Sequence, residues 1–558
     1  MACTVSNVAD NVQILQDYSL LQIQMRNHEA FNDSRLHLLN LNSKNPRYWI
    51  GLAISYHLLE NYKTAEKILK LYEGTLKEKP GPMNFEHSEM MLYHNLIIEE
   101  SGNIQEAFDH LESIKNDTCD RRAWKEKRAQ FLLKLNRLEE AEKAYEELIE
   151  NNPDCYNYYE GLVELRSVSH HADDLTSEQE EKLVSMYKDL AQKYPKSNTI
   201  KFFPLLHITG EGFRVAVDNY MRAALRKGIP SLFVNVKKLY KDPQKEIIIE
   251  RLVEEYLQNL KNHGTFAQNE GTDNDFMEPP TAYLWTLYLL SQHYDYKRDT
   301  AKALELINEA IEHTPTLVEL YMTKGRILKH GGNLPEAVKT MNEARELDLQ
   351  DRFINSKCSK YMLRNGQDTD AEKTIGLFTR GDAPDPITDL VDMQCMWFAL
   401  EEAGCYVKQN KLGKALKRLH QIEKHFADIT DDQFDFHTYC LRKVTLRAYL
   451  SMLRLEDQLR SHPYYLRAAQ EAIKIYVKLH DNPEIAVLSE KEQDYEKTKD
   501  DQTKKKAEKP QDDDPDGEKL LKTDDPLGEA FKFLLPLQEL SSKRIETHLF
   551  GFEIYLRK

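Results

Sequence analysis

The sequence lacks the signatures of several protein classes. Its seven cysteines are scattered without a CxxC pair, which argues against a zinc ribbon or a disulfide framework and favours a reducing, intracellular compartment. No apolar run reaches the ~20 residues of a membrane span, and the N-terminal MACTVSNVAD carries no signal-peptide core. Alternating runs between hairpin turns are also missing, so little β-structure is expected.

An excess of positive charge is also lacking, since 92 Asp and Glu outnumber 76 Lys and Arg. The 558 residues carry a formal net charge of −16, which disfavours bulk nucleic-acid binding, and no sequence-specific nucleic-acid partner or membrane contact is predicted. A composition of 41% hydrophobic and 30% charged residues suits an exposed helical array. The predicted location is the cytoplasm, with a nuclear fraction if the lysine triplet 504–506 is a targeting signal and not a solvated charge run.

What the sequence does contain is a repeat. Ala303, Ala337 and Ala371 recur at 34-residue intervals, with Gly325 at the helix-crossing position and Gly332 at an interhelical turn. This is the period of the tetratricopeptide (TPR) repeat, a helix pair that buries its apolar face only by stacking on a neighbour. Further small residues continue the pattern at Ala65, Ala107, Ala141 and Ala415. The sequence predicts an all-α, TPR-type solenoid with a right-handed superhelix.

The pattern divides the chain into six predicted parts. A segment with twelve acids and eight lysines at 490–519 cannot bury enough apolar area to offset the entropy of ordering, so it is predicted to be a disordered linker. The parts are N-terminal repeats at 1–165, irregular helical repeats at 166–280, central repeats at 281–428, helical C-terminal repeats at 429–485, the charged linker at 486–525 and C-terminal helices at 526–558.

Catalytic motifs are missing. There is no P-loop, HExxH or GxSxG string, and the closest match to an acetyl-CoA phosphate turn, at 268–273, ends in an acidic residue with no strand before it. No catalytic or metal-binding residue is predicted. A scaffold is therefore favoured over an enzyme, and a TPR adaptor for chaperones or other proteins is the alternative scaffold.

Seven stretches depart from the generic TPR pattern and carry a family resemblance. They resemble the large auxiliary subunit of the NatA N-terminal acetyltransferase, over nearly the whole chain from about residue 11. The stretches are SLLQIQMR (19–26), TPTLVELY (314–321), DRFINSKC (351–358), MQCMWF (393–398), ITDDQFDFHTYC (429–440), KLHDNP (478–483) and IETHLFGFEIYLRK (545–558).

This resemblance implies a non-catalytic scaffold. In that family it wraps a small catalytic subunit that uses acetyl-CoA, tunes it toward small N-terminal residues exposed after methionine removal, docks at the ribosome and binds a small inhibitory subunit. Inositol hexakisphosphate lies between the two main subunits. The family has further repeats before the matched part, a longer and more basic linker, and sequence beyond residue 558, so we expect a shortened array in which ribosome docking is in doubt.

A polyanion site needs several converging cations. Lys414, Lys417 and Arg418 share one helix face at i, i+3 and i+4, and Arg442 and Lys443 lie on a later helix. Together with the resemblance, this spacing predicts the inositol phosphate site, although an ordinary solvated basic face has the same spacing.

A groove for the protein partner is predicted on the first helices of the central repeats, because positions 2, 5, 9 and 12 of a TPR unit face inward. Arginine and aromatic residues are frequent anchors at such interfaces. Trp397 fits the core between repeats equally well. The predicted groove residues are Met322, Arg326, Lys329, Phe353, Lys360 and Trp397.

Overall fold

The computed structural model describes residues 11–76, 84–165, 177–267, 277–485 and 514–558. Throughout these ranges every regular element is a helix, and no strand occurs. The predicted all-α fold is confirmed. The rejected acetyl-CoA turn at 268–273 and most of the predicted linker lie outside the described residues.

The helices form two compact units. The first unit comprises Met1–Ile208 and Ile429–Asp457, and the second comprises Thr209–Asp428 and Gln458–Lys558. The helices of the first unit are α2 (Val12–Gln24), α3 (His28–Leu41), α4 (Pro46–Leu58), α5 (Tyr62–Thr75), α6 (Phe85–Glu100), α7 (Ile104–Ser113), α8 (Arg121–Lys134), α9 (Leu138–Asn151), α10 (Tyr156–Leu165), α11 (Ser177–Lys193), α12 (Asn198–Phe202), α13 (Pro204–His207), α26 (Phe434–Lys443) and α27 (Leu446–Asp457).

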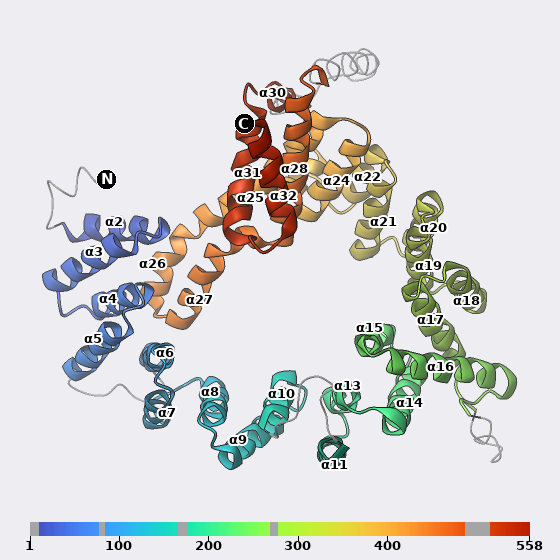
Figure 1. The fold of residues 1–558 in the computed structure, drawn as a ribbon, viewed down its shortest axis with the longest axis horizontal. Coiled ribbons are helices and arrows are strands. Elements are labelled where there is room, and N and C mark those ends of the chain that lie inside the picture. The colour runs from blue at the N-terminus through green and yellow to red at the C-terminus, as the bar shows by residue number, and fades with distance from the viewer. Residues whose placement is uncertain (1–10, 77–83, 166–176, 268–276, 486–513) are drawn as a thin grey trace. The chain divides into compact units, whose positions relative to one another are not determined.

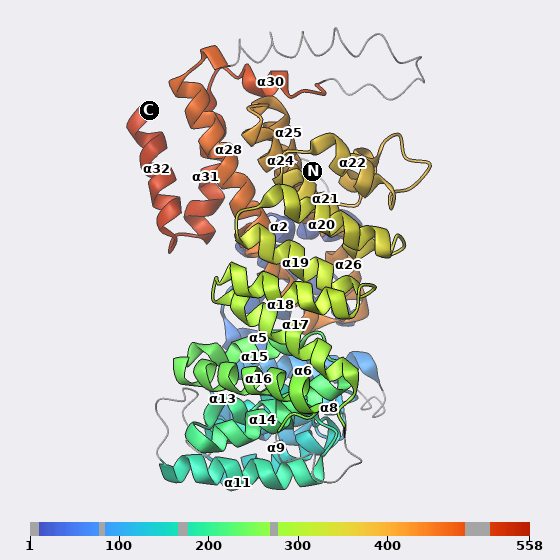
Figure 2. The ribbon, with the colours of Figure 1, turned by 90° about the vertical axis from the view of Figure 1, so that its right-hand side faces the viewer.

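The second unit holds the central repeats and the C-terminal helices. Its pairs α17–α18 and α19–α20 follow one another as a stack (Figure 1, Figure 2). Its helices are α14 (Gly210–Lys227), α15 (Leu232–Val236), α16 (Pro243–His263), α17 (Pro280–Tyr296), α18 (Thr300–His313), α19 (Val318–His330), α20 (Leu334–Leu347), α21 (Arg352–Arg364), α22 (Asp368–Gly376), α23 (Pro386–Asp392), α24 (Met396–Lys408), most of α25 (Leu412–Asp432), α28 (Pro463–Asp481), α30 (Glu518–Leu521), α31 (Pro526–Leu540) and α32 (Ile545–Arg557).

The repeat is built on its small residues. All seven alanines that mark the period are fully buried on the second helix of a pair, where a larger side chain would push the helices apart. Gly325 on α19 shows how close the approach is, because a Cβ there would lie 3.3 Å from the Ala337 carbonyl oxygen and 3.2 Å from Met341 Cε. The TPR-type periodicity predicted from these residues is therefore visible as helix packing.

The turn inside each pair also recurs. Residues with positive φ stand at positions 26, 60, 102, 136, 298, 332, 366 and 410, directly before a second helix. An Asn or Asp follows most of them and caps that helix, as where Asn333 accepts a hydrogen bond from the Glu336 amide and Asp299 from the Lys302 amide. One left-handed residue thus reverses the chain within each of these pairs, and in most of them a side-chain cap follows it.

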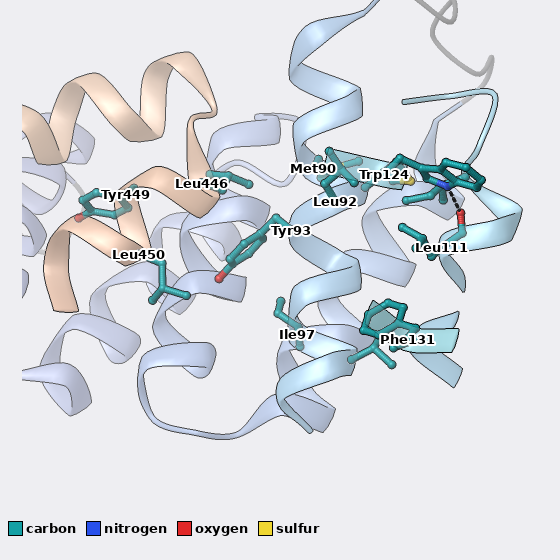
Figure 3. Close-up of a cluster of buried hydrophobic side chains, with 14 of the residues drawn as sticks. Met90, Leu92, Tyr93, Ile97, Leu111, Trp124, Phe131, Leu446, Tyr449 and Leu450 are labelled. Carbon is teal, nitrogen blue, oxygen red and sulfur yellow. Dashed lines mark hydrogen bonds between the residues drawn. The ribbon is translucent and has the colours of Figure 1, made fainter. Parts of the chain in front are cut away.

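The first unit is completed by a segment from far along the chain. Leu446 and Leu450 of α27 lie next to Tyr93 of α6, and Tyr449 of α27 belongs to the same apolar cluster (Figure 3). Three of the ion pairs around this cluster join α27 to the N-terminal helices: Arg447–Glu89, Arg454–Glu100 and Arg26–Glu456, each at 2.7 Å. Residues 429–457 therefore pack with the N-terminal repeats.

The units divide two of the predicted parts, and the predicted 166–280 part is split between Ile208 and Thr209. The predicted 429–485 part is divided at Asp457, since the helix that follows, α28, packs with α31 and α32 of the second unit. The predicted disordered linker also ends before 525. Residues from 514 onward are described and carry α30. The charged run ends in the apolar pair 520–521, and Leu521 of this pair is buried.

The described residues form neither a membrane-spanning helix nor a metal-binding cluster. No helix in the described ranges is long and apolar enough to cross a membrane. Within the same ranges no cluster of three or more His, Cys, Asp or Glu side chains could hold a metal ion. The six cysteines that the structure describes are free thiols.

Candidate functional site

Successive first helices of the central pairs are joined on one face by polar contacts. On α19, Arg326 donates to the Gln292 side chain of α17 at 3.0 Å, and Lys329 lies 5.8 Å from the centre of the Tyr361 ring of α21. On α21, Arg364 donates two hydrogen bonds of 2.8 Å to Glu401 of α24. These links run through α17, α19, α21 and α24 in order and define one continuous surface.

This surface carries five cations, which we call the α19–α21 basic cluster: Arg326, Lys329, Lys357, Lys360 and Arg364. Among the described residues, two carboxylates pair with them. Asp295 lies 3.5 Å from Arg326, and Glu401 lies 3.1 Å from Lys360 and 2.8 Å from Arg364. Positive charge is therefore in excess here, in a chain whose net charge is −16.

Two lysines of the cluster have no counter-ion. Neither Lys329 nor Lys357 is ion-paired to any residue that the structure describes. Partial burial and the neighbouring cations, Arg364 and Arg326 among them, lower the pKa of Lys329. Burial together with Lys360, Arg364 and Arg326 likewise lowers the pKa of Lys357. An arriving carboxylate or phosphate would relieve this repulsion, so the cluster is suited to an anionic surface.

Aromatic side chains border the cluster. Phe353 is 57% exposed, and the Lys357 ammonium lies 5.1 Å from the centre of its ring. Trp397 and Met322 are partly buried against the core of the repeats, and Lys360 lies 5.7 Å from the Trp397 ring centre. Exposed aromatic and guanidinium groups side by side are common anchors of protein interfaces.

All six predicted groove residues thus lie on or beside this surface. Sequence reasoning missed Lys357 and Arg364, which share one face of α21 with Lys360 at i, i+3 and i+7. That spacing could have identified Lys357 and Arg364 from the sequence.

The predicted polyanion residues are distributed differently. Lys414, Lys417 and Arg418, here called the α25 basic cluster, line one cavity of about 460 Å³ in the second unit. Arg442 and Lys443 are exposed on α26, which belongs to the first unit. The structure therefore brings three of the five together.

Each cation of the α25 basic cluster already has a partner within the chain. Arg418 forms an ion pair with Glu402, whose side chain is fully buried. Lys414 lies 3.3 Å from the Asp516 carboxylate, and Lys417 donates to the Asp514 carbonyl oxygen at 2.7 Å. Three carboxylates, Glu372, Asp385 and Asp516, line the cavity together with the three cations, so the lining carries no excess of positive charge.

Comparison with known proteins identifies the family. The profile described as "N-terminal acetyltransferase A, auxiliary subunit" matches residues 85–510 and 486–558. The chain belongs to this family. The prediction made from the seven resembling stretches is confirmed, and the family is that of an auxiliary subunit and not of a catalytic one.

Curated relatives agree. The chain is 42% identical to the N-terminal acetyltransferase A complex auxiliary subunit NAA15 of Arabidopsis thaliana, over 98% of this chain and 64% of the relative. It is 41% identical to the NatA auxiliary subunit N-alpha-acetyltransferase 16 of Homo sapiens, over 98% of this chain and 66% of the relative. The chain thus spans slightly less than two thirds of the length of these relatives.

A solved structure is similar as well. The structure of Naa15/Naa10 bound to HypK-THB matches with a TM-score of 0.86 and 41% sequence identity, over 98% of this chain and 76% of that one. At this level the likeness covers the arrangement of the repeats and not their helical character alone.

Proposed function

We propose that this chain is the non-catalytic scaffold of an N-terminal acetyltransferase A complex, and that it holds the catalytic subunit through the α19–α21 basic cluster. The observation that carries the proposal is the pair of uncompensated lysines, Lys329 and Lys357, on successive first helices of a NatA auxiliary-subunit family member. The similar solved structure, titled as a complex of Naa15 with Naa10, supports a second chain as the occupant.

The role follows from what the cluster offers. It supplies several cations and one exposed aromatic ring, that of Phe353, on a stack of helices. These groups can fix the orientation of a partner, but the cluster supplies no nucleophile or general base set for a reaction. Acetyl-CoA binding and acyl transfer then belong to the partner. Selection of small N-terminal residues would arise from contacts that shape the partner's active site.

Four finer roles belong to the same proposal. Inositol hexakisphosphate would bind the α25 basic cluster at the interface with the catalytic subunit, since closely spaced lysines and arginine suit a compact polyphosphate. The ribosome and a small inhibitory subunit would be further partners. The cytoplasm is the expected location.

The proposal is tested by charge reversal. The Lys329→Glu/Lys357→Glu double variant should lose at least about 100-fold in affinity for the catalytic subunit, since two central charges would become repulsive. The matched control is Lys339→Glu/Lys373→Glu, because these lysines are 67% and 75% exposed on the second helices α20 and α22. Affinity is measured by titrating the scaffold onto immobilised catalytic subunit.

Two results would overturn the proposal. One is a double variant that binds as tightly as the control. The other is turnover of a Ser- or Ala-starting peptide with acetyl-CoA by the purified chain alone, because a scaffold should show none until the catalytic subunit is added.

A further inference from the structure

A short segment at the end of the charged run lies against the beginning of α25. We call residues 514–521 the strap; it carries α30 and ends at Leu521, which is buried in the core formed with α25, α28 and α31. Its first residue also orders it locally, since the Asp514 carboxylate accepts hydrogen bonds from the amides of Glu518 at 2.7 Å and Lys519 at 3.1 Å. The strap is therefore anchored at both ends.

Two glycines permit the strap to touch the helix backbone. A Cβ on Gly413 would lie 2.4 Å from the Asp516 carbonyl oxygen, and a Cβ on Gly517 would lie 2.1 Å from the Gly413 carbonyl oxygen. Gly517 also has a φ of +72°, which side chains other than glycine rarely adopt. The close contact requires glycine at both positions, so the strap has one defined position on α25.

In this position the strap brings a carboxylate and a carbonyl group into contact with the cations of the α25 basic cluster. Asp516 pairs with Lys414, and the Asp514 carbonyl takes a hydrogen bond from Lys417. Pro515 and Asp516 also line the 460 Å³ cavity. A phosphate-rich ligand entering this cavity would need the same two ammonium groups that the strap holds.

We propose that the strap is an internal competitor for the polyanion, so that the ligand binds the α25 basic cluster only as it takes Lys414 and Lys417 from the strap. This inference rests on the polyanion site of the proposed function. Competition works in both directions, so bound polyphosphate also weakens the hold of α25 on the strap. The contact between the strap and α25 would therefore depend on whether a polyanion is bound at the site.

The test uses the full chain and inositol hexakisphosphate as the probe, with affinity measured by calorimetry. Asp516→Asn should bind about fivefold more tightly than the wild type, the value of one partly exposed ion pair, and the gain should shrink at high salt. The matched control is Asp524→Asn, because Asp524 is exposed and has no ion-pair partner in the described part of the chain. It removes the same charge without releasing Lys414.

A third variant separates the two proposals. If Lys414→Gln leaves binding of the probe unchanged, or if the wild type binds none, the polyanion site itself is wrong. If Lys414→Gln weakens binding but Asp516→Asn binds no more tightly than Asp524→Asn, the site stands and the competing strap is wrong. As a second readout, saturating probe should speed trypsin cleavage after Lys519 in the wild type, whereas protection of that bond would overturn the competition.

Discussion

Glu401 and Glu402 are neighbours on α24, yet they serve two basic clusters of opposite character. Glu401 is shared between Lys360 and Arg364 in a cluster that holds more cations than carboxylates. Glu402 is buried against Arg418 in a cluster where every cation has its own acceptor. The comparison teaches that basic residues locate an anion site only when the carboxylates around them are counted too.

The largest expected effect is on stability. Glu402→Ala should lower the free energy of unfolding by about 3–5 kcal/mol, because the side chain of Arg418 is only 14% exposed and would be left as an unpaired buried charge. Glu401→Ala should cost no more than about 1 kcal/mol, since its partners keep access to water. Denaturant titration near pH 8 measures both. Equal losses would remove the contrast between the clusters, and Glu402→Ala/Arg418→Met should recover most of the loss.

The same contrast predicts a pH dependence. Burial raises the pKa of Glu402 to about 7, even with Arg418 beside it, from an ordinary value of 4.5. The folded state then binds this proton more tightly than the unfolded chain does. The stabilisation that comes from protonating Glu402 is therefore complete below pH 4.5 and is lost as the pH rises through about 7. The Tm of the wild type should therefore fall relative to that of Glu402→Gln over this range. Parallel curves would contradict the assignment.

The smallest effect concerns binding. Glu401→Gln removes one of the two carboxylates that balance the α19–α21 basic cluster, so the catalytic subunit should bind about fivefold more tightly and with a steeper dependence on salt. Titrations at two ionic strengths measure the change. Weaker binding would show that Glu401 is needed to hold Lys360 and Arg364 in position for the partner.

Much of the fold could be predicted because the repeat depends on small side chains at fixed positions. The buried alanines and Gly332 mark helix contacts and a turn that few other residues allow. The turns at Glu60, Asn136 and Arg298 were not predicted, because these residues adopt positive φ without being glycine. The capping residues Asn61 and Asp299, which follow Glu60 and Arg298, were the usable signal at two of these turns.

The candidate site was predicted only in part. Spacing found cations on shared helix faces, including Arg326, Lys360 and Lys414, because periodicity is a property of a single helix. It could not show which of them are already paired. The strap contacts α25 from about a hundred residues away, as in the bond from Lys417 to Asp514. No local pattern encodes that contact, so the balanced charge of the α25 basic cluster appears only in three dimensions.

The first unit is built from two separate segments of the chain, and this affects how it folds during synthesis. Its N-terminal helices, up to Ile208, are made before the second segment, Ile429–Asp457, that completes their apolar cluster. At ordinary elongation rates this delay is on the order of 10–40 s. During that interval Tyr93 lacks Leu446 and Leu450, and Glu89 lacks Arg447. The nascent chain therefore exposes an unfinished apolar face for tens of seconds, a window in which a chaperone could act on it.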